Sequence, residues 1–268
     1  MYFRKTIMPL KKKLSPSILN NKEEIDYLKN GWVKIPKLIS ITQVKNIKKT
    51  VSEFLNQNNK NYDKKNINFL TNNKNKKVVH SFHKLSDSSK IKKFGMQKKF
   101  LKIAEQLIGD KTKFRKCELF AKPAKIGIKS PPHQDNFYWC LKNVNSITIW
   151  IALDKSNKEN GAMYYYNGSH KLGLVDHIAS NIKGSSQTVK DKNLSKKFKK
   201  ITPSLQIGDA LIHDSHVIHG STQNKSNKNR MGVTIQFQSQ KCKIDIKKQK
   251  IYLNSLSKQI KKRSNARI

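Results

Sequence analysis

The feature that most constrains the fold is a series of short β-type runs in the second half of the chain. The runs follow Lys111 and are separated by turn-forming residues; they are Phe114–Ala121, Ser146–Leu153, Ala162–Tyr166, Ala210–His213, Val217–His219 and Met231–Phe237. Several short strands interrupted by turns are typical of antiparallel sandwiches and barrels. We therefore expect a mainly β fold with flanking helices, an α+β protein in which the strands form a jelly roll.

Helices are expected ahead of these strands. Thr42–Leu55 and Lys98–Ile108 carry apolar residues at helical spacing, and a glycine that can end the second helix follows it. An earlier helix is expected to end at Gly31, before a short strand at Trp32–Ile35. Residues 56–77 are rich in Asn and Lys and poor in apolar side chains, so we expect a mobile loop there.

The length of 268 residues fits one large domain. We predict a basic arm at residues 1–20, a single jelly-roll domain with N-terminal helices at residues 21–240, and a basic tail with weak helical periodicity at residues 241–268. No apolar run approaches the ~18 residues that a membrane span needs. The N-terminus also lacks the apolar segment of a secretory signal, so neither a span nor a signal is expected.

The three cysteines, Cys117, Cys140 and Cys242, are an odd number and form no Cys-x-x-Cys pair. This pattern argues against a disulfide framework and against a zinc site. It fits free thiols in a reducing compartment, so we expect a cytoplasmic protein.

The chain carries 56 Lys and Arg against 17 Asp and Glu, a formal net charge of +39. Such an excess can indicate a polyanionic partner, either nucleic acid or an acidic membrane surface. Only five of the basic residues are arginine, however, and it is the planar arginine fork that reads bases and clamps phosphates. The lysines are scattered through every segment, and Lys and Asn share A/T-rich codons. We therefore interpret the charge as compositional drift and expect no specific nucleic-acid binding.

The segment with the clearest chemical content is Pro-Pro-His-Gln-Asp-Asn-Phe-Tyr-Trp at residues 131–139. His133 and Asp135 are two apart, so on an extended backbone both side chains would leave the same face of a sheet. One imidazole and one carboxylate are two thirds of the 2-His-1-carboxylate set that holds non-haem iron and leaves positions open. Zinc hydrolases commonly use His-Glu-x-x-His on a helix, and that motif does not occur here.

A second segment, residues 207–237, supplies the missing histidine and a cation. His219 is followed by Gly220 and Ser221, a polar turn comes next, and Arg230 opens an alternating strand. We expect these two strands to form a hairpin that places Arg230 across from His219. A guanidinium there would suit a dicarboxylate cosubstrate that chelates the metal at one end and needs its far carboxylate held.

Two other histidines lie close to His219 in the sequence. On a regular strand His216 has the opposite parity, so it and His219 cannot both face the interior. His213 shares parity with His219, but six residues at ~3.3 Å each would place it about 20 Å away. Because Gly220 and Ser221 follow His219 and Arg230 lies only eleven residues after it, we expect His219 to be the ligand and His213 and His216 to pack around the site.

These motifs resemble those of the phytanoyl-CoA dioxygenase family of 2-oxoglutarate-dependent oxygenases. The matching stretches are His-Gln-Asp-Asn-Phe-Tyr-Trp (133–139), residues 150–171, Gly-Asp-Ala-Leu-Ile-His-Asp-Ser-His-Val-Ile-His-Gly-Ser (208–221) and residues 224–230. The family pattern Pro-Gly-Ser-His is changed at its first position, where this chain has Asn167. Asn also suits tight turns, so the departure is mild.

The resemblance implies a double-stranded β-helix of the cupin-like type, with Fe(II) held by His133, Asp135 and His219. It also implies that Arg230 binds the distal carboxylate of 2-oxoglutarate, with Ser221 and Trp150 near this cosubstrate. The implied reaction consumes 2-oxoglutarate and oxygen, releases succinate and CO2, and hydroxylates a small organic substrate. Relatives that halogenate lack the ligating carboxylate, so hydroxylation is the expected outcome.

Two other readings remain open. The chain could be an oxygenase that acts on a nucleic acid or another polyanion, or a non-catalytic jelly-roll protein that binds metal. The sequence carries no signal for substrate identity or oligomeric state. The segments expected to define the substrate are residues 56–77 and 172–200.

Overall fold

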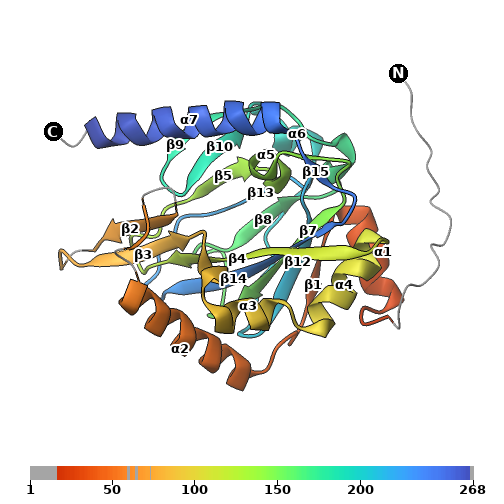
Figure 1. Cartoon of the computed structure of the whole chain (residues 1–268), viewed down its shortest axis with the longest axis horizontal. Coiled ribbons are helices and arrows are strands. Elements are labelled where there is room, and N and C mark those ends of the chain that lie inside the picture. Colours follow the sequence, from red (N-terminus) through yellow and green to blue (C-terminus); the bar gives the residue numbers. More distant parts are fainter. Residues whose placement is uncertain (1–16, 59–60, 64–65, 73, 266–268) are drawn as a thin grey trace.

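Two antiparallel sheets and a set of covering helices make up the computed structural model (Figure 1). It describes residues 17–265 except 59–60, 64–65 and 73. Most of the predicted basic arm, residues 1–16, therefore lies outside the described residues. Leu19, near the end of that arm, is buried.

The larger sheet has seven strands, and its order mixes strands from both halves of the chain. In order they are β1 (Trp32–Ile35), β12 (Ala210–Asp214), β7 (Ser146–Ala152), β14 (Arg230–Ser239), β4 (Thr112–Lys122), β3 (Lys77–Phe82) and β2 (Ile67–Thr71). The smaller sheet has four, β11 (Lys200–Ile201), β8 (Met163–Tyr166), β13 (His219–Ser221) and β5 (Ser130–His133). All strand pairs are antiparallel, which confirms the expected mainly β class.

Two small pairs complete the strands, β9 (His177–Ile182) with β10 (Ser185–Val189), and β6 (Leu141–Lys142) with β15 (Lys243–Ile244). The helices are α1 (Asn21–Asn30), α2 (Ile41–Asn58), α3 (Ser89–Gly95), α4 (Lys98–Ile108), α5 (Asp135–Trp139), α6 (Leu194–Lys197) and α7 (Ile246–Asn265), with short 3-10 turns at Leu85–Asp87 and Ser169–Leu172. Figure 1 shows α2, α3 and α4 on one side of the large sheet and the small sheet on the other.

Side-chain alternation gives the large sheet two different faces. On β7, Ile147, Ile149 and Ile151 belong to the apolar core that α2 and α4 cover. The intervening Thr148 and Trp150 border a pocket on the opposite face, toward the small sheet. The same alternation on β4 and β14 means that one face of the sheet stabilises the fold while the other forms the site.

Local sequence explains where the first helices begin and end. Asn20 caps α1: its side chain accepts from the Glu23 amide, and the Glu23 carboxylate accepts from the Asn20 amide. Gly31 ends that helix at a φ of 80°, in the left-handed region that glycine adopts readily. Gly109 ends α4 in the same way, as the sequence predicts.

The prediction of a mobile loop over residues 56–77 is wrong in part. Residues 67–71 form β2, which pairs with β3 and extends the edge of the large sheet. Ile67 is buried, so the few apolar residues of this Asn- and Lys-rich segment are enough to hold an edge strand. Residues 172–200 likewise contain the β9–β10 pair and α6.

The C-terminal helix packs against the jelly-roll strands and α5. In Figure 1 α7 crosses the top of the molecule, next to β9, β10 and α5. The Tyr252 ring lies 5.6 Å from that of Tyr138 and 6.4 Å from that of Phe137, centroid to centroid. Among the described residues no helix has the length and apolar content to cross a membrane.

Candidate metal centre and adjoining pockets

The structure brings His133, Asp135 and His219 together between the two sheets. His133 and His219 face each other as Cα partners on the paired strands β5 and β13, and their ring centroids are 4.3 Å apart. Asp135 is the first residue of α5. One potential ligand atom from each of the three residues lies within 4.8 Å of the others, a spacing that could hold a metal ion.

The parity argument for His133 and Asp135 is wrong, although the two side chains do meet. Strand β5 ends at His133, and the chain turns at Gln134 into α5 instead of continuing as a strand. His133 Nε2 and Asp135 Oδ1 are 3.9 Å apart. The turn, not strand alternation, directs the carboxylate toward the imidazoles.

Both imidazoles present an unprotonated Nε2 to the carboxylate. His133 Nδ1–H donates to the Pro131 carbonyl (2.8 Å), and His219 Nδ1–H donates to the Val217 carbonyl (3.0 Å). A carbonyl can only accept, so each neutral ring carries its lone pair on Nε2. Burial lowers the pKa of both histidines, which favours the neutral form that binds metal.

The Asp135 carboxylate is held from its other side. Its Oδ2 accepts from Thr148 Oγ1 (2.6 Å) and from His213 Nε2 (3.2 Å), while Oδ1 points toward the two facing histidines. Burial opposes ionisation, but the His213 hydrogen bond and the surrounding histidines outweigh it and hold the pKa of Asp135 below its usual range. The carboxylate is therefore ionised, with one oxygen available to a metal.

The expected 20 Å separation of His213 and His219 is wrong. Their ring centroids are 4.5 Å apart, because the chain leaves the large sheet after β12, turns, and enters the small sheet as β13. His213 donates to Asp135 and accepts from the Tyr165 hydroxyl at Nδ1 (3.0 Å). It lies beside the candidate ligand set, whereas His216 contacts the Asn136 side chain.

Arg230 lines the same pocket, but the expected hairpin with the His219 strand does not form. β13 belongs to the small sheet, and β14 pairs with β4 and β7 in the large one. Arg230 is buried, and its Nε and one terminal nitrogen both donate to the Gly161 carbonyl. The guanidinium lies 5.0 Å from the centroid of the Trp150 ring.

A second buried basic side chain, Lys122, lines the same pocket and was not predicted from the sequence. Its Nζ donates to the carbonyls of Ile128 and Thr222, and no carboxylate among the described residues pairs with it or with Arg230. Burial and the neighbouring guanidinium lower the pKa of Lys122, and burial lowers that of Arg230 to about 9. One lysine in a lysine-rich chain carries no local signal, so only the fold reveals it.

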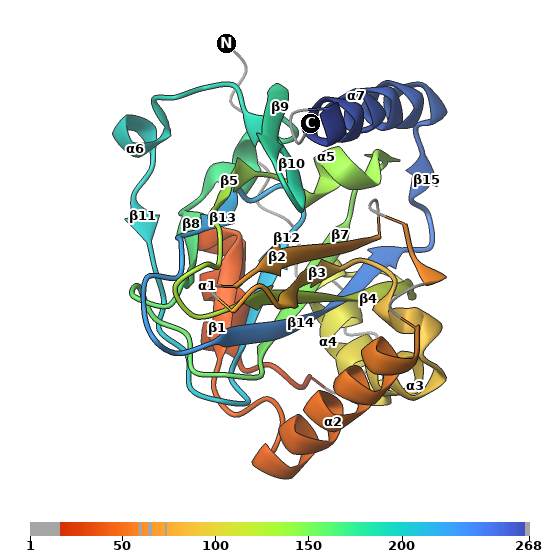
Figure 2. The same cartoon turned by 90° about the vertical axis from the view of Figure 1, so that its left-hand side faces the viewer.

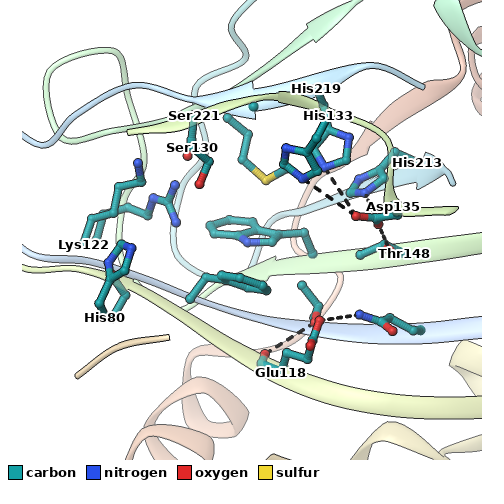
Figure 3. A pocket seen from close by; sticks show the side chains of 18 residues that line it. His80, Glu118, Lys122, Ser130, His133, Asp135, Thr148, His213, His219 and Ser221 are labelled. Atoms are coloured by element: carbon teal, nitrogen blue, oxygen red, sulfur yellow. Dashed lines mark hydrogen bonds and ion pairs between the residues drawn. The ribbon is translucent and has the colours of Figure 1, made fainter. Parts of the chain in front are cut away.

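The metal triad and the cations border one pocket from different directions. In Figure 3 His133, His219, His213 and Asp135 are grouped on one side, and Lys122 lies on the opposite side. The Trp150 and Ser221 side chains predicted near a cosubstrate also line this inner pocket. It therefore combines a metal-ligand set with two buried basic side chains that have no ion-pair partner among the described residues.

Gly220 allows the close backbone approach that its sequence position suggests. A Cβ added there would lie 2.4 Å from Tyr164 Oη and 2.7 Å from the Ser130 carbonyl oxygen.

The altered turn at Asn167 also has a clear role, because its side-chain oxygen accepts a hydrogen bond from Trp32 Nε1 (2.8 Å). The Asn thus ties this turn to strand β1.

A larger outer cleft opens onto the metal triad. It shares Glu118, Phe120, Ser130, His133 and Asp135 with the inner pocket. Its further walls come from β2, the turn between β9 and β10, and α7. Figure 2 shows these elements on the same side of the molecule. The two segments expected to define a substrate, residues 56–77 and 172–200, both contribute to this cleft.

Comparison with known proteins gives a family match over most of the chain. Residues 27–232 match the family model described as phytanoyl-CoA dioxygenase (PhyH). The chain is 28% identical over 170 residues to a phytanoyl-CoA dioxygenase of Arabidopsis thaliana, covering 62% of this chain and 58% of that protein. It is 25% identical over 172 residues to the peroxisomal phytanoyl-CoA dioxygenase of Bos taurus, covering 62% and 51%. The chain thus spans about half the length of the curated relatives it matches.

Solved structures show the same fold at low sequence identity. The epimerase SnoN of nogalamycin biosynthesis, in complex with Fe3+, α-ketoglutarate and nogalamycin RO, has a TM-score of 0.66 at 17% identity, covering 82% of this chain and 84% of that one. EctD from S. alaskensis, with 2-oxoglutarate and 5-hydroxyectoine, has a TM-score of 0.66 at 17% identity, covering 82% and 76%. These similarities confirm the expected double-stranded β-helix.

Proposed function

Because the chain belongs to the phytanoyl-CoA dioxygenase family, we propose that it is an Fe(II)- and 2-oxoglutarate-dependent dioxygenase that hydroxylates a small organic substrate. The observation that carries the proposal is the composition of the inner pocket. Two neutral imidazoles and one ionised carboxylate meet at one side, and two buried basic side chains, Arg230 and Lys122, lie at the other. This arrangement suits a dicarboxylate that chelates the metal at one end and places its other carboxylate beside the basic side chains.

The residues present fit Fe(II) by the chemistry of their donors. His133 and His219 offer Nε2 lone pairs, and Asp135 offers the oxygen that Thr148 and His213 leave free. Such a mixed nitrogen and oxygen set leaves further positions open on iron. Together with molecular oxygen, bound iron and 2-oxoglutarate would supply the oxidising chemistry that converts a C–H bond to an alcohol: one oxygen atom would enter the substrate and the other succinate, with release of CO2.

The cations at the far side have a binding role in this proposal. Arg230 is fixed by its two bonds to the Gly161 carbonyl, which leaves its other terminal nitrogen available to a carboxylate. Lys122 lies in the same pocket, and a carboxylate bound there would favour its protonated form. Holding the distal carboxylate there directs the opposite end of 2-oxoglutarate toward the metal triad, with Trp150 and Ser221 along the pocket wall.

Asp135 favours hydroxylation as the outcome. A ligating carboxylate would occupy the metal position that a halide needs, and Asp135 Oδ1 faces the Nε2 atoms of His133 and His219. Residues around the triad also exclude water: His219, His213 and Trp150 are all nearly inaccessible to solvent. The substrate C–H bond would reach the metal through the outer cleft.

The test is turnover of 2-oxoglutarate. Purified protein is loaded anaerobically with Fe(II), oxygen and 2-oxoglutarate are added, and succinate is measured. We expect iron-dependent succinate formation even without a substrate, and its loss in the Asp135→Ala variant with the fold retained by circular dichroism. Succinate formation in that variant at the wild-type rate would remove Asp135 from the mechanism. No turnover by the iron-loaded wild type would contradict the proposed function.

A further inference from the structure

Arginine is rare in this chain, and its placement is selective. Five of the 56 basic residues are arginine, and three of them, Arg115, Arg230 and Arg263, lie among the described residues. Arg230 lines the inner pocket, and the other two line the outer cleft. Lys84, Lys116 and Lys122 also line these pockets, but only the three arginines offer a planar fork that can bind an oxyanion with two parallel hydrogen bonds.

The backbone aims Arg115 into the cleft. Opposite β14, Gln236 pairs with Lys116 and Phe237 with Phe114, so Arg115 is the extra residue of a β-bulge. Regular alternation cannot place both Phe114 and Cys117 in the apolar core, because they are three residues apart. The extra residue of the bulge shifts the alternation, so that Phe114 and Cys117 can both face the core. Arg115 and Lys116 then both lie on the cleft side.

The Arg115 guanidinium is positioned but not neutralised. It lies 4.6 Å from the centroid of the Trp139 ring, and one terminal nitrogen donates to the Gln238 side chain. Its Nε is buried without a hydrogen-bond partner, and no described carboxylate lies within ion-pair distance. A partly buried cation with donors to spare, in a cleft that opens onto the metal triad, is a built site for an anion.

The neighbouring charges indicate what kind of anion fits. Lys116 is paired with Glu118 (2.6 Å), so this lysine adds no free positive charge, and the His83 ring contacts the same carboxylate (2.9 Å). Asp135 adds negative charge nearby. Glu118 and Asp135 therefore limit the net positive charge around Arg115, which suits the single charge of a carboxylate better than a phosphate dianion.

We propose that Arg115 binds a carboxylate group of the substrate and thereby positions the rest of the molecule for reaction at the metal triad. The substrate class is then a small organic acid whose body lies against the aromatic side chains Phe120, Tyr138 and Tyr252 of the cleft. This inference rests on the proposed function, because it assigns the outer cleft to the substrate of that reaction.

Binding is measured with the inner pocket already filled. Wild-type protein saturated with Mn(II) and 2-oxoglutarate is titrated by calorimetry with hexanoate, benzoate and phenylacetate, with their primary amides, and with phenyl phosphate. We expect at least one acid to bind and its amide to bind roughly tenfold more weakly or worse, as for the loss of one charge-assisted contact. In Arg115→Gln the affinity for that acid should fall by a similar factor, and Arg115→Lys should recover part of it.

Lys84→Gln is the matched control, because Lys84 is exposed on the wall of the same cleft and its loss changes the charge equally. It should retain the affinity for the acid. Equal binding of acid and amide, unchanged affinity in Arg115→Gln, equal losses in both variants, or no binding by any acid would overturn the proposal. Tighter binding of phenyl phosphate would overturn the carboxylate assignment. Succinate formation by the wild type without substrate is measured in parallel, so a failure of the proposed function is seen separately.

Discussion

At the scale of single residues, the candidate metal centre depends on how three histidines divide their roles. His133 and His219 direct their Nδ1 protons to backbone carbonyls and their Nε2 atoms toward Asp135. His213 instead uses its Nε2–H to donate to the same carboxylate. The difference makes the first two candidate ligands and the third a group that orients a ligand.

Alanine substitutions separate these roles. His219→Ala should abolish tight Fe(II) binding, because the metal loses a ligand. His213→Ala should weaken binding by about 10- to 100-fold, as for the loss of a hydrogen bond to a ligand. His216→Ala should bind Fe(II) normally. Calorimetric titration with Fe(II) under anaerobic conditions measures all three; iron binding retained in His219→Ala but lost in His216→Ala would refute the assignment.

Arg230 allows a test of geometry at constant charge. Arg230→Lys keeps a cation but loses the fork whose Nε and terminal nitrogen hold the Gly161 carbonyl. Affinity for 2-oxoglutarate should fall by ~1–3 kcal/mol, the range of a charge-assisted hydrogen bond. Lys225→Arg, on the loop before β14, is the control for a Lys/Arg exchange outside the pocket. It should bind 2-oxoglutarate with wild-type affinity. An unchanged Kd for 2-oxoglutarate in Arg230→Lys would point to another anchor.

The sequence predicted the residues of this site better than the distances between them. The neighbours of His219, a glycine and a serine, are local signals, and the structure places Arg230 and Trp150 in the same pocket as expected. The relation of His213 to His219 depends on a crossover between sheets, which no strand period encodes. Lys122 could not be found at all, because lysine is common throughout the chain.

At the scale of elements, β14 positions the pocket wall through a glycine. A Cβ added to Gly232 would lie 2.0 Å from Trp150 Cζ2, so the indole rests directly on the strand backbone. Six of the seven predicted strands and both longer N-terminal helices lie close to their predicted ranges, because apolar periodicity and glycine stops are local, whereas the predicted strand Val217–His219 overlaps β13 only at His219. The β2–β3 edge and α5 were missed, since the first is poor in apolar residues and the second is a single short turn after β5.

Gly232→Ala should therefore force the Trp150 ring into the inner pocket. We expect a loss of stability of about 1–3 kcal/mol from overpacking, together with weaker 2-oxoglutarate binding. Gly173→Ala is the comparison: it is strained by a φ of +68° but has no atom within 4 Å of the added Cβ. Urea unfolding and cosubstrate titration of both variants should show a binding defect in Gly232→Ala alone. Normal binding in Gly232→Ala would mean that the indole does not line the cosubstrate site.

At the scale of the whole molecule, buried histidines make the fold sensitive to acid. Burial lowers the pKa of His80, His177 and His216 to about 4, against about 6.5 in an unfolded chain. As the pH falls below 6.5, the unfolded state takes up protons that the folded state does not. Asp214 acts in the opposite direction, because burial raises its pKa to about 6.

The three histidines outweigh the one aspartate, so the free energy of unfolding should fall between pH 6.5 and 4.5. Each fully shifted histidine contributes at most about 1.4 kcal/mol per pH unit. Urea unfolding of the metal-free protein at pH 7.5, 6.5 and 5.5 measures the slope. Stability that is constant or rises on acidification would contradict this account.

The net charge of +39 concerns the molecule as a whole. Any binding to DNA or RNA should be non-specific and should fall steeply between low and physiological salt, because scattered lysines act through counterion release. Fluorescence anisotropy with unrelated duplexes and single strands over a salt series measures this. Tight binding of one sequence at physiological salt would instead favour an oxygenase that acts on nucleic acid.

The side chains that line the inner pocket come from both sheets, so a ligand bound there would connect the two sheets. His133 and His219 belong to the small sheet, whereas Lys122 and Arg230 belong to the large one. A metal ion with a chelating dicarboxylate would therefore hold the small sheet against the large sheet. Loading with both should slow hydrogen exchange of amides in the two layers at once, on strands that share no hydrogen bonds with each other.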